Sequence, residues 1–177
     1  MFKGKKTVLR AYRKEDAEAA CRFFNDEEFR SLLDPRGLLP VSLPEEEAFV
    51  AESMNPKDRS KAYNFAVTTL QGKYIGGCSY FALDARNRTA YIGVAIGDKA
   101  LWGKGYGSDA LRTLLRLLFG EMNVRKALLN VFAYNSRAIA CYKSLGFREE
   151  GRLKEQCYRG GKYHDDLVMA LFAEDFR

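Results

Sequence analysis

The chain has 177 residues, of which 47% are hydrophobic and 29% are charged, and its formal net charge is +6. This composition excludes disordered and fibrous proteins, and no apolar stretch approaches the roughly 20 residues that a membrane span needs. The N-terminus lacks the apolar core of a signal peptide, so we expect a single domain over residues 1–177, located in the cytoplasm.

The first third of the chain predicts a strand followed by two helices. The strand covers 7–12, and the first helix covers 14–25, where apolar residues recur every three or four positions. A proline-rich loop separates the two helices. Ser42 and Glu45 fit a capping box that begins the second helix, which ends near residue 54.

Alternating apolar residues then predict three antiparallel strands in a row. A hairpin over 62–68 and 74–83 turns at Gln71 and Gly72, and a third strand covers 88–96. The remaining predicted elements are a glycine-rich loop at 100–108, a helix at 107–122, a strand at 126–132, a helix at 136–144, and extended segments at 147–158 and 163–172.

The order of these elements predicts an α+β fold. One crossover helix must join two parallel strands within an otherwise antiparallel sheet. We therefore expect a mixed, mostly antiparallel central sheet.

The glycine-rich loop carries Gly103, Gly105 and Gly107 at alternate positions. Glycines permit backbone conformations in which successive N–H groups form an anion-binding nest, and the N-terminus of the next helix and Lys104 add positive charge. A pyrophosphate fits such a loop, although a plain tight turn uses the same glycines. The Walker pattern GxxxxGK[ST] is absent and the fingerprint GxGxxG is only approached, which leaves a nicotinamide or ATP enzyme as a weaker alternative.

Two motifs resemble the GNAT superfamily of acyl-CoA N-acyltransferases. The first runs from IGVAI at 92–96 to WGKGYG at 102–107, and the second is NSRAIACYKSLGF at 135–147. The opening strand and the segment RGGKYHDDLVM at 159–169 resemble the branch of spermidine and ribosomal-protein N-terminal acetyltransferases. The resemblance implies a GNAT-like sheet flanked by about four helices, with one parallel strand pair that splays apart. It also implies direct acetyl transfer from acetyl-CoA to a primary amine within a ternary complex.

The site residues are likewise implied by the resemblance. The strand residues Val94, Ala95 and Ile96 pair with the pantetheine arm, and Asn130 lies on the second splayed strand. The glycine loop holds the pyrophosphate through Gly103, Lys104, Gly105, Tyr106, Gly107 and Ser108. Asn135 and Ala138 of the next helix line the arm. Tyr142 would lie beside the thioester sulfur and is the candidate general acid, because a phenol with a pKa of about 10 is protonated at neutral pH.

Three of these residues also have a plain structural interpretation. Asn135 suits the N-cap of the short helix, and Lys104 suits a solvated position. Tyr142 lies on an apolar helical stripe with Ala138 and Leu145, as a core residue would. Both interpretations stay open for each residue.

The general base is not evident, because Tyr91 occupies a position on the strand before Gly93 where the family often has a carboxylate. The proton of the amine would pass to solvent, to Tyr91 through water, or to a carboxylate of the N-terminal region. The acceptor is equally open: a protein N-terminus, a polyamine, an antibiotic or a metabolite. Acidic runs at 26–28 and 45–47 would attract a cationic amine or form solvated helix surface, and the second interpretation is favoured for 45–47.

Other partners are limited by composition. With one histidine and four cysteines that form no CxxC pair, we expect no metal site. We expect no membrane and no nucleic-acid partner, because strand aromatics such as Phe81 and Tyr91 are typical of sheet faces and not of a stacking platform. The alternative function is a non-catalytic acyl-CoA- or nucleic-acid-binding module of the same fold, and a homodimer or larger homo-oligomer stays open.

Overall fold

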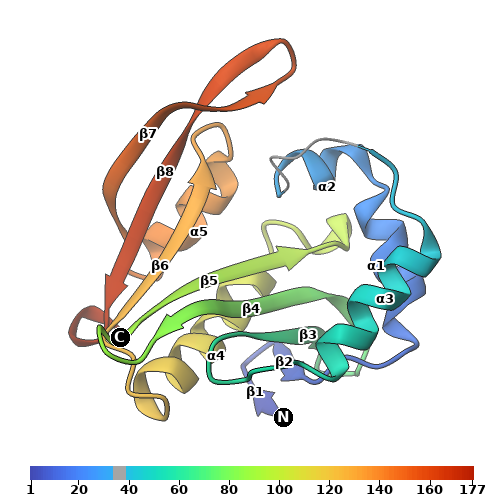
Figure 1. The fold of residues 1–177 in the computed structure, drawn as a ribbon, viewed down its shortest axis with the longest axis horizontal. Helices are drawn as coiled ribbons and strands as arrows, with labels where there is room; N and C mark the ends of the chain where they lie inside the picture. Colours follow the sequence, from blue (N-terminus) through green and yellow to red (C-terminus); the bar gives the residue numbers. More distant parts are fainter. Residues whose placement is uncertain (34–38) are drawn as a thin grey trace.

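A computed structural model describes residues 1–33 and 39–177, and within them eight strands form one sheet in the order β1-β2-β3-β4-β5-β6-β8-β7 (Figure 1). The strands are β1 Phe2–Lys3, β2 Thr7–Arg10, β3 Tyr63–Thr69, β4 Tyr74–Asp84, β5 Thr89–Ile96, β6 Lys126–Phe132, β7 Arg148–Arg159 and β8 Lys162–Phe172. The α-helices are α1 Asp16–Phe24, α2 Glu27–Ser31, α3 Leu43–Met54, α4 Tyr106–Gly120 and α5 Ser136–Ser144. Two short 3₁₀ turns, η1 Lys99–Leu101 and η2 Ala173–Asp175, complete the elements.

The sheet splits between β5 and β6, which form its parallel pair. Their pairing covers Thr89 with Lys126 through Tyr91 with Leu128 and then stops. Beyond that point β5 continues along β4 while β6 continues along β8, so the two strands diverge (Figure 1). The predicted mixed sheet with one splayed parallel pair is confirmed.

Helices cover the two faces of the sheet separately. The apolar side of α4 presents Leu111, Leu114, Leu115 and Leu118, all fully buried, to one face, where α5 also packs. Burying a leucine side chain contributes about 1.5–3 kcal/mol, so this layer holds the main core. The opposite face carries α1 and α3, whose smaller cluster centres on Val50.

The predicted element bounds agree closely wherever the local signal is strong. The strand at 126–132 and the helix at 136–144 are confirmed at both ends, and the capping box of Ser42 and Glu45 begins α3. The helix expected at 107–122 begins one residue earlier, at Tyr106, and ends at Gly120. The proline-rich loop lies partly outside the described residues.

Neither the strand β1 nor the helix α2 was predicted. The two residues of β1 are exposed and have no apolar alternation of their own, and they form a strand only by pairing with β2. The five residues of α2 are too few for a helical period, and Asp26 caps this helix by accepting a hydrogen bond from the backbone N–H of Phe29 at 3.0 Å.

The N-terminal segment is tied to the start of α4 by one carboxylate. Asp109 accepts hydrogen bonds from the backbone N–H groups of Lys5, Lys6 and Thr7, each at 2.9 Å, and from the Thr7 hydroxyl at 2.7 Å. A Cβ at Gly4 would lie 2.3 Å from an Asp109 oxygen, so this close approach requires glycine. The first residues of the chain are thereby held beside the glycine loop.

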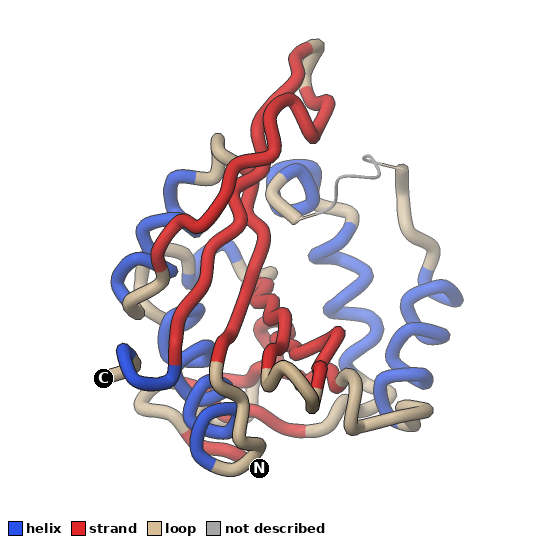
Figure 2. Tube along the Cα trace, turned by 60° about the vertical axis from the view of Figure 1, so that its left-hand side comes forward, coloured by secondary structure: helices blue, strands red, loops and turns tan. Residues whose placement is uncertain are grey.

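The hairpin of β7 and β8 extends beyond the rest of the sheet (Figure 2). Its inner strand, β8, pairs with β6 through Asp166 opposite Phe132. The hairpin therefore carries residues near the C-terminus to the open side of the split. Within residues 1–33 and 39–177, every helix falls short of the length and hydrophobicity required to cross a membrane.

Candidate active site

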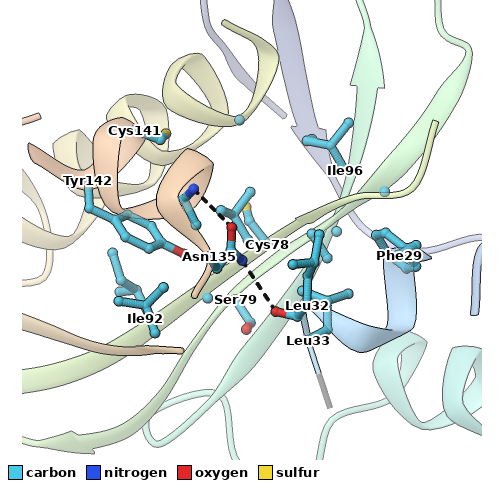
Figure 3. Close-up of a pocket in the computed structure, with 18 of the residues that line it drawn as sticks. Phe29, Leu32, Leu33, Cys78, Ser79, Ile92, Ile96, Asn135, Cys141 and Tyr142 are labelled. Carbon is cyan, nitrogen blue, oxygen red and sulfur yellow. Dashed lines mark hydrogen bonds between the residues drawn. The ribbon is translucent and has the colours of Figure 1, made fainter. Parts of the chain in front are cut away.

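A cavity of about 1270 Å³ occupies the split between β5 and β6. It is lined from β4 and β5, the glycine loop, β6, α5 and the first two helices, so elements that cover both faces of the sheet border it. Every residue of the predicted site lines this cavity except Lys104, whose side chain is exposed outside it. Predicted site residues up to 48 positions apart in the chain, from Val94 to Tyr142, meet here, and Figure 3 shows Ile96, Asn135 and Tyr142 among them.

The outer half of β5 has one free edge. Val94, Ala95 and Ile96 pair with Cys78, Gly77 and Gly76 of β4 on one side. On the side of β6 no described strand pairs with them, because the parallel ladder has already ended. Backbone N–H and C=O groups need partners, and an extended ligand that carries amides can supply them as an added strand does.

The glycine loop has the geometry of an anion site at a helix N-terminus. Gly103 and Gly105 have positive φ, at 71° and 83°, and Gly105 is the N-cap of the 15-residue helix α4. Trp102 fixes the start of the loop, because its ring N–H donates to the Ile96 carbonyl at 2.5 Å. Backbone N–H groups at the beginning of α4 lack helical partners, and the helix dipole favours negative charge there.

Two cations at this loop were not predicted. Lys6 donates from its ammonium to the Lys104 carbonyl at 2.7 Å, and a Cβ at Gly105 would lie 3.7 Å from that ammonium. Arg137 of α5 stacks on the Trp102 ring, with its guanidinium carbon 3.6 Å from the ring centroid. Lys6 could not be found from sequence spacing, since it lies 98 residues from Lys104.

Tyr142 lies on α5 with its side chain turned toward the cavity (Figure 3). It is only 7% exposed, and its ring packs edge-on against Phe147 with centroids 6.0 Å apart. Burial, and to a lesser degree Cys141, raises the pKa of Tyr142 well above its ordinary value. The hydroxyl is therefore protonated throughout the physiological pH range, as a proton donor must be.

Asn135 is the N-cap of α5, as one of its two predicted roles requires. Its Oδ1 accepts from the Ala138 backbone N–H at 3.1 Å, and its Nδ2 reaches the Leu32 carbonyl at 3.5 Å (Figure 3). The neighbouring Tyr134 donates its hydroxyl proton to the Ser31 carbonyl at 2.7 Å. The end of α2 is thereby joined to the start of α5, across the mouth of the split.

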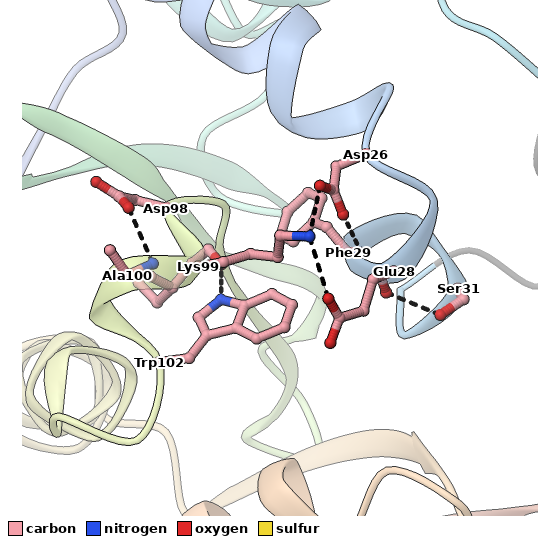
Figure 4. Close-up of polar contacts among 9 residues, drawn as sticks. Asp26, Glu28, Phe29, Ser31, Asp98, Lys99, Ala100 and Trp102 are labelled. Carbon is pink, nitrogen blue, oxygen red and sulfur yellow. Dashed lines mark hydrogen bonds and ion pairs between the residues drawn. The ribbon is translucent and has the colours of Figure 1, made fainter.

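The acidic run at 26–28 does not present free carboxylates to the cavity. The Lys99 ammonium lies 2.7 Å from Asp26 and 3.1 Å from Glu28 (Figure 4). The hydrogen bond that Lys99 donates, together with the one from the Phe29 backbone N–H, lowers the pKa of Asp26. An intramolecular cation thus occupies the place in which a cationic acceptor was considered, and none of the three acidic residues lines the cavity.

The cavity wall on the other side of the split carries a carboxylate that was not predicted. Asp166 is 8% exposed, and its Oδ2 accepts a hydrogen bond from Asn130 Nδ2 at 2.9 Å. Its Oδ1 is buried without a hydrogen-bond partner among the described residues. Only the paired aspartates of the segment YHDDL hinted at it, and they do not indicate which one faces the site.

An aromatic pair lines the floor near the point where the strands separate. Phe81 and Tyr91 stack with their centroids 5.8 Å apart. Phe81 lies on a sheet face, as expected, and is 44% exposed where that face borders the cavity. Within the described part of the chain, His, Cys, Asp and Glu side chains nowhere gather into a group of three that could hold a metal ion.

Comparison with known proteins places this arrangement in a family. The Acetyltransferase (GNAT) domain family matches residues 6–148. The uncharacterized N-acetyltransferase p20 of Bacillus licheniformis is 24% identical over 169 residues, which make up 96% of this chain and 94% of that protein. Spermidine N(1)-acetyltransferase of Vibrio cholerae is 30% identical over 112 residues, covering 63% of this chain and 64% of that protein.

Solved structures share the fold over nearly the whole chain. Spermidine N-acetyltransferase from Vibrio cholerae, in complex with CoA and spermine, has a TM-score of 0.83 at 24% identity, covering 96% of both chains. A GNAT-family acetyltransferase from Bacillus anthracis has a TM-score of 0.83 at 22% identity, covering 98% of both chains. With the family match over 6–148 and the split sheet, the resemblance expected from the two motifs is confirmed, and the chain belongs to the acetyltransferase (GNAT) family.

Proposed function

We propose that the protein transfers the acetyl group of acetyl-CoA to a primary amine by direct attack within a ternary complex. The observation that carries the proposal is the free edge of β5, which lies in one cavity with the glycine loop and the buried Tyr142. Membership of the GNAT family supports it, as does the CoA complex of the Vibrio cholerae spermidine enzyme.

In this proposal the chain binds the donor along its length. Backbone groups of Val94, Ala95 and Ile96 pair with the amides of the pantetheine arm, and Asn130, Asn135 and Ala138 line its path. The pyrophosphate lies on the backbone amides from Gly103 to Ser108, where Lys6 adds the positive charge that was expected from Lys104. A backbone N–H of β5 polarises the thioester carbonyl in the manner of an oxyanion hole.

The chemical step needs one proton donor from the chain. The neutral amine nitrogen attacks the thioester carbon, the new C–N bond forms, the nitrogen releases one proton to water, and the C–S bond breaks with its electron pair on sulfur. The Tyr142 hydroxyl donates its proton to that sulfur and regains a proton from solvent. The protonated state that burial imposes on Tyr142 supports this role. The scheme requires no covalent enzyme intermediate.

The first test is thiol release from acetyl-CoA with spermidine, short peptides with free N-termini and aminoglycosides, together with the thermal shift that acetyl-CoA produces. Thiol release that depends on one amine class supports the reaction and identifies the acceptor. A thermal shift without turnover favours the alternative, a non-catalytic acyl-CoA-binding module. The absence of both overturns the proposal, and RNA or DNA binding that weakens steeply with salt would favour a nucleic-acid module.

Replacing Tyr142 tests the catalytic assignment. We expect Tyr142→Phe to lower kcat by about 10²–10⁴-fold, the usual contribution of general acid–base catalysis. The thermal shift with acetyl-CoA should persist, because the donor is held by backbone groups and not by this hydroxyl. Tyr163→Phe is the matched control, since it removes the same atom from a side chain that is 65% exposed on the hairpin. A wild-type kcat in Tyr142→Phe would contradict the assignment.

A further inference from the structure

Gly93 of β5 is a glycine that neither the backbone nor the packing of the fold requires. Its φ lies outside the left-handed region. A Cβ at this position would meet only the Ser79 hydroxyl among the described residues, at an ordinary contact distance of 3.6 Å. Glycine weakens a strand, because it loses more freedom on folding and has no side chain to pack. The missing side chain therefore needs a reason other than folding.

The two glycines of β4 that line the cavity differ in this respect. A Cβ at Gly76 would clash with the Ala95 carbonyl oxygen, and a Cβ at Gly77 would clash with the Tyr12 hydroxyl. Close packing of the chain against itself explains both glycines. Gly93 instead leaves space in the cavity that it lines.

Gly93 lies where the split begins. The parallel ladder ends at the pair of Tyr91 and Leu128, two residues before it on β5. Ile92, the residue between, packs in the same core cluster as Tyr142. Because neighbouring strand residues point to opposite faces, Gly93 opens onto the face that carries α1 and α3, away from Tyr142.

The strand register gives Gly93 a polar neighbour on that face. Gly93 is paired with Ser79 of β4, and Ser79 is paired with Asn64 of β3. Asn64 donates to the Ser53 hydroxyl of α3 at 3.1 Å, which fixes the face to which this row of residues points. The adjacent Cys78 belongs to the core cluster and points to the opposite side of β4 (Figure 3).

The Ser79 hydroxyl is available to a ligand. Ser79 is partly exposed and lines the cavity, and its hydroxyl makes no hydrogen bond within residues 1–33 and 39–177. A serine hydroxyl accepts two hydrogen bonds and donates one, and it carries no charge. It therefore suits the neutral nitrogen that attack on a thioester requires.

Aromatic side chains border this row on the same face. Two residues along the strands in one direction, Phe81 and Tyr91 are paired and stacked. Two residues in the other direction, the Tyr12 hydroxyl lies against Gly77. All four residues line the cavity. A ligand that approaches over Gly93 therefore passes between Tyr12 and the stacked pair.

We propose that the acceptor amine reaches the thioester over Gly93 and that the Ser79 hydroxyl holds its nitrogen. This inference rests on the proposed acetyl transfer and adds a residue that touches the acceptor. The Ser79 oxygen accepts a hydrogen bond from the neutral amine, which leaves the nitrogen lone pair to face the thioester carbon. Attack makes the nitrogen positive, and the hydrogen bond strengthens before the nitrogen releases its proton to water. Tyr142 protonates the sulfur from the other face.

Gly93→Ala tests the path of the amine. Its methyl group would stand between the amine and the thioester, and a displacement of about 1 Å can lower the rate about 10²-fold. We expect kcat/KM to fall by about that factor for whichever amine the wild type acetylates among spermidine, short peptides with free N-termini and aminoglycosides. Tm should not fall, because alanine suits the backbone conformation. The acetyl-CoA thermal shift should persist, because the methyl group points away from the free edge of β5.

Gly151→Ala is the matched control for this variant. Gly151 is a glycine of β7 outside the cavity, and a Cβ there would also meet one ordinary contact, Val168 Cβ at 3.9 Å. It should keep the wild-type kcat/KM. Wild-type kcat/KM in Gly93→Ala would overturn the inference.

Ser79→Ala tests the contact with nitrogen. We expect kcat/KM for the same amine to fall about 2- to 10-fold, the loss expected for one hydrogen bond, with Tm and the acetyl-CoA thermal shift unchanged. Ser136→Ala, at an exposed position of α5 outside the cavity, is the control and should keep the wild-type value. An unchanged kcat/KM in Ser79→Ala would overturn the assignment of Ser79.

The two proposals fail in different ways. If the wild type acetylates an amine and both Gly93→Ala and Ser79→Ala do so equally well, the proposed function stands and the acceptor path is wrong. If the wild type acetylates no amine of the panel, both proposals are wrong.

Discussion

Glu46 of α3 is a buried carboxylate whose cost to the fold can be measured. It is 5% exposed, and its Oε1 has no hydrogen-bond partner among the described residues. Burial raises the pKa of Glu46 above its ordinary value. An acid whose folded pKa exceeds its unfolded pKa stabilises the fold below the unfolded pKa, and this contribution is lost as the pH rises through the folded pKa. At neutral pH the charged side chain therefore destabilises the protein.

We expect Glu46→Gln to raise Tm at pH 7. In a chain of this size, each ~1 kcal/mol added to the free energy of unfolding raises Tm by about 2–4 °C. The gain should shrink toward pH 4, where the wild-type carboxyl also becomes neutral. Thermal unfolding across this pH range measures the effect. Glu47→Gln, at an exposed position on the same helix, is the control and should leave Tm unchanged. A lower Tm in Glu46→Gln would show that the charge has a stabilising partner.

At the scale of elements, α4 and the N-terminal strands hold the glycine loop together. Burial raises the pKa of Asp109, but hydrogen bonds from Thr7 and from the amides of Lys5 and Lys6 lower it by more, so its pKa lies below the ordinary value. A carboxylate with a depressed folded pKa stabilises the fold above its unfolded pKa, and the contribution is lost as the pH falls through the folded pKa. The N-terminal anchor should therefore weaken in acid.

Asp109→Asn tests this anchor. We expect a lower Tm at pH 7, because an amide cannot accept from three N–H groups and a hydroxyl as a carboxylate does, and each hydrogen bond to a charged group contributes about 1.5–3 kcal/mol. The difference from wild type should narrow as the pH falls below about 4. Asp175→Asn, exposed near the C-terminus, is the control. If the difference in Tm between Asp109→Asn and wild type does not change with pH, the stabilisation does not come from the charge of the Asp109 carboxylate.

At the scale of the whole molecule, the fold brings Lys6 to the glycine loop. The net charge of +6 suits a phosphorylated donor but does not identify which cations meet it. We expect Lys6→Ala to raise the Kd for acetyl-CoA about two- to five-fold, in line with partly exposed ion pairs. Lys104→Ala, which removes an exposed side chain outside the cavity, should raise it less. Calorimetric titration of both variants with acetyl-CoA measures the two Kd values. A larger increase in Kd for Lys104→Ala than for Lys6→Ala would contradict the assignment of the positive charge at the loop to Lys6.

Features that depend on contacts within a few residues could be predicted from the sequence alone. The helical period and Asn135 cap predict α5, the capping box of Ser42 predicts the start of α3, and alternating apolar residues predict the antiparallel strands. The site residues came from the resemblance of two motifs to the GNAT family, and all of them but Lys104 line one cavity.

Which distant side chains share that cavity or its rim is visible only once the chain is folded. Lys99 forms ion pairs with Asp26 and Glu28, and Asp166 reaches the split from the C-terminal hairpin. None of these pairings leaves a periodic or local signal, because each depends on how the sheet opens between β5 and β6 and on which strands flank the opening. Sequence periodicity reports the conformation of a segment, whereas the charges that meet in a site depend on the packing of the whole chain.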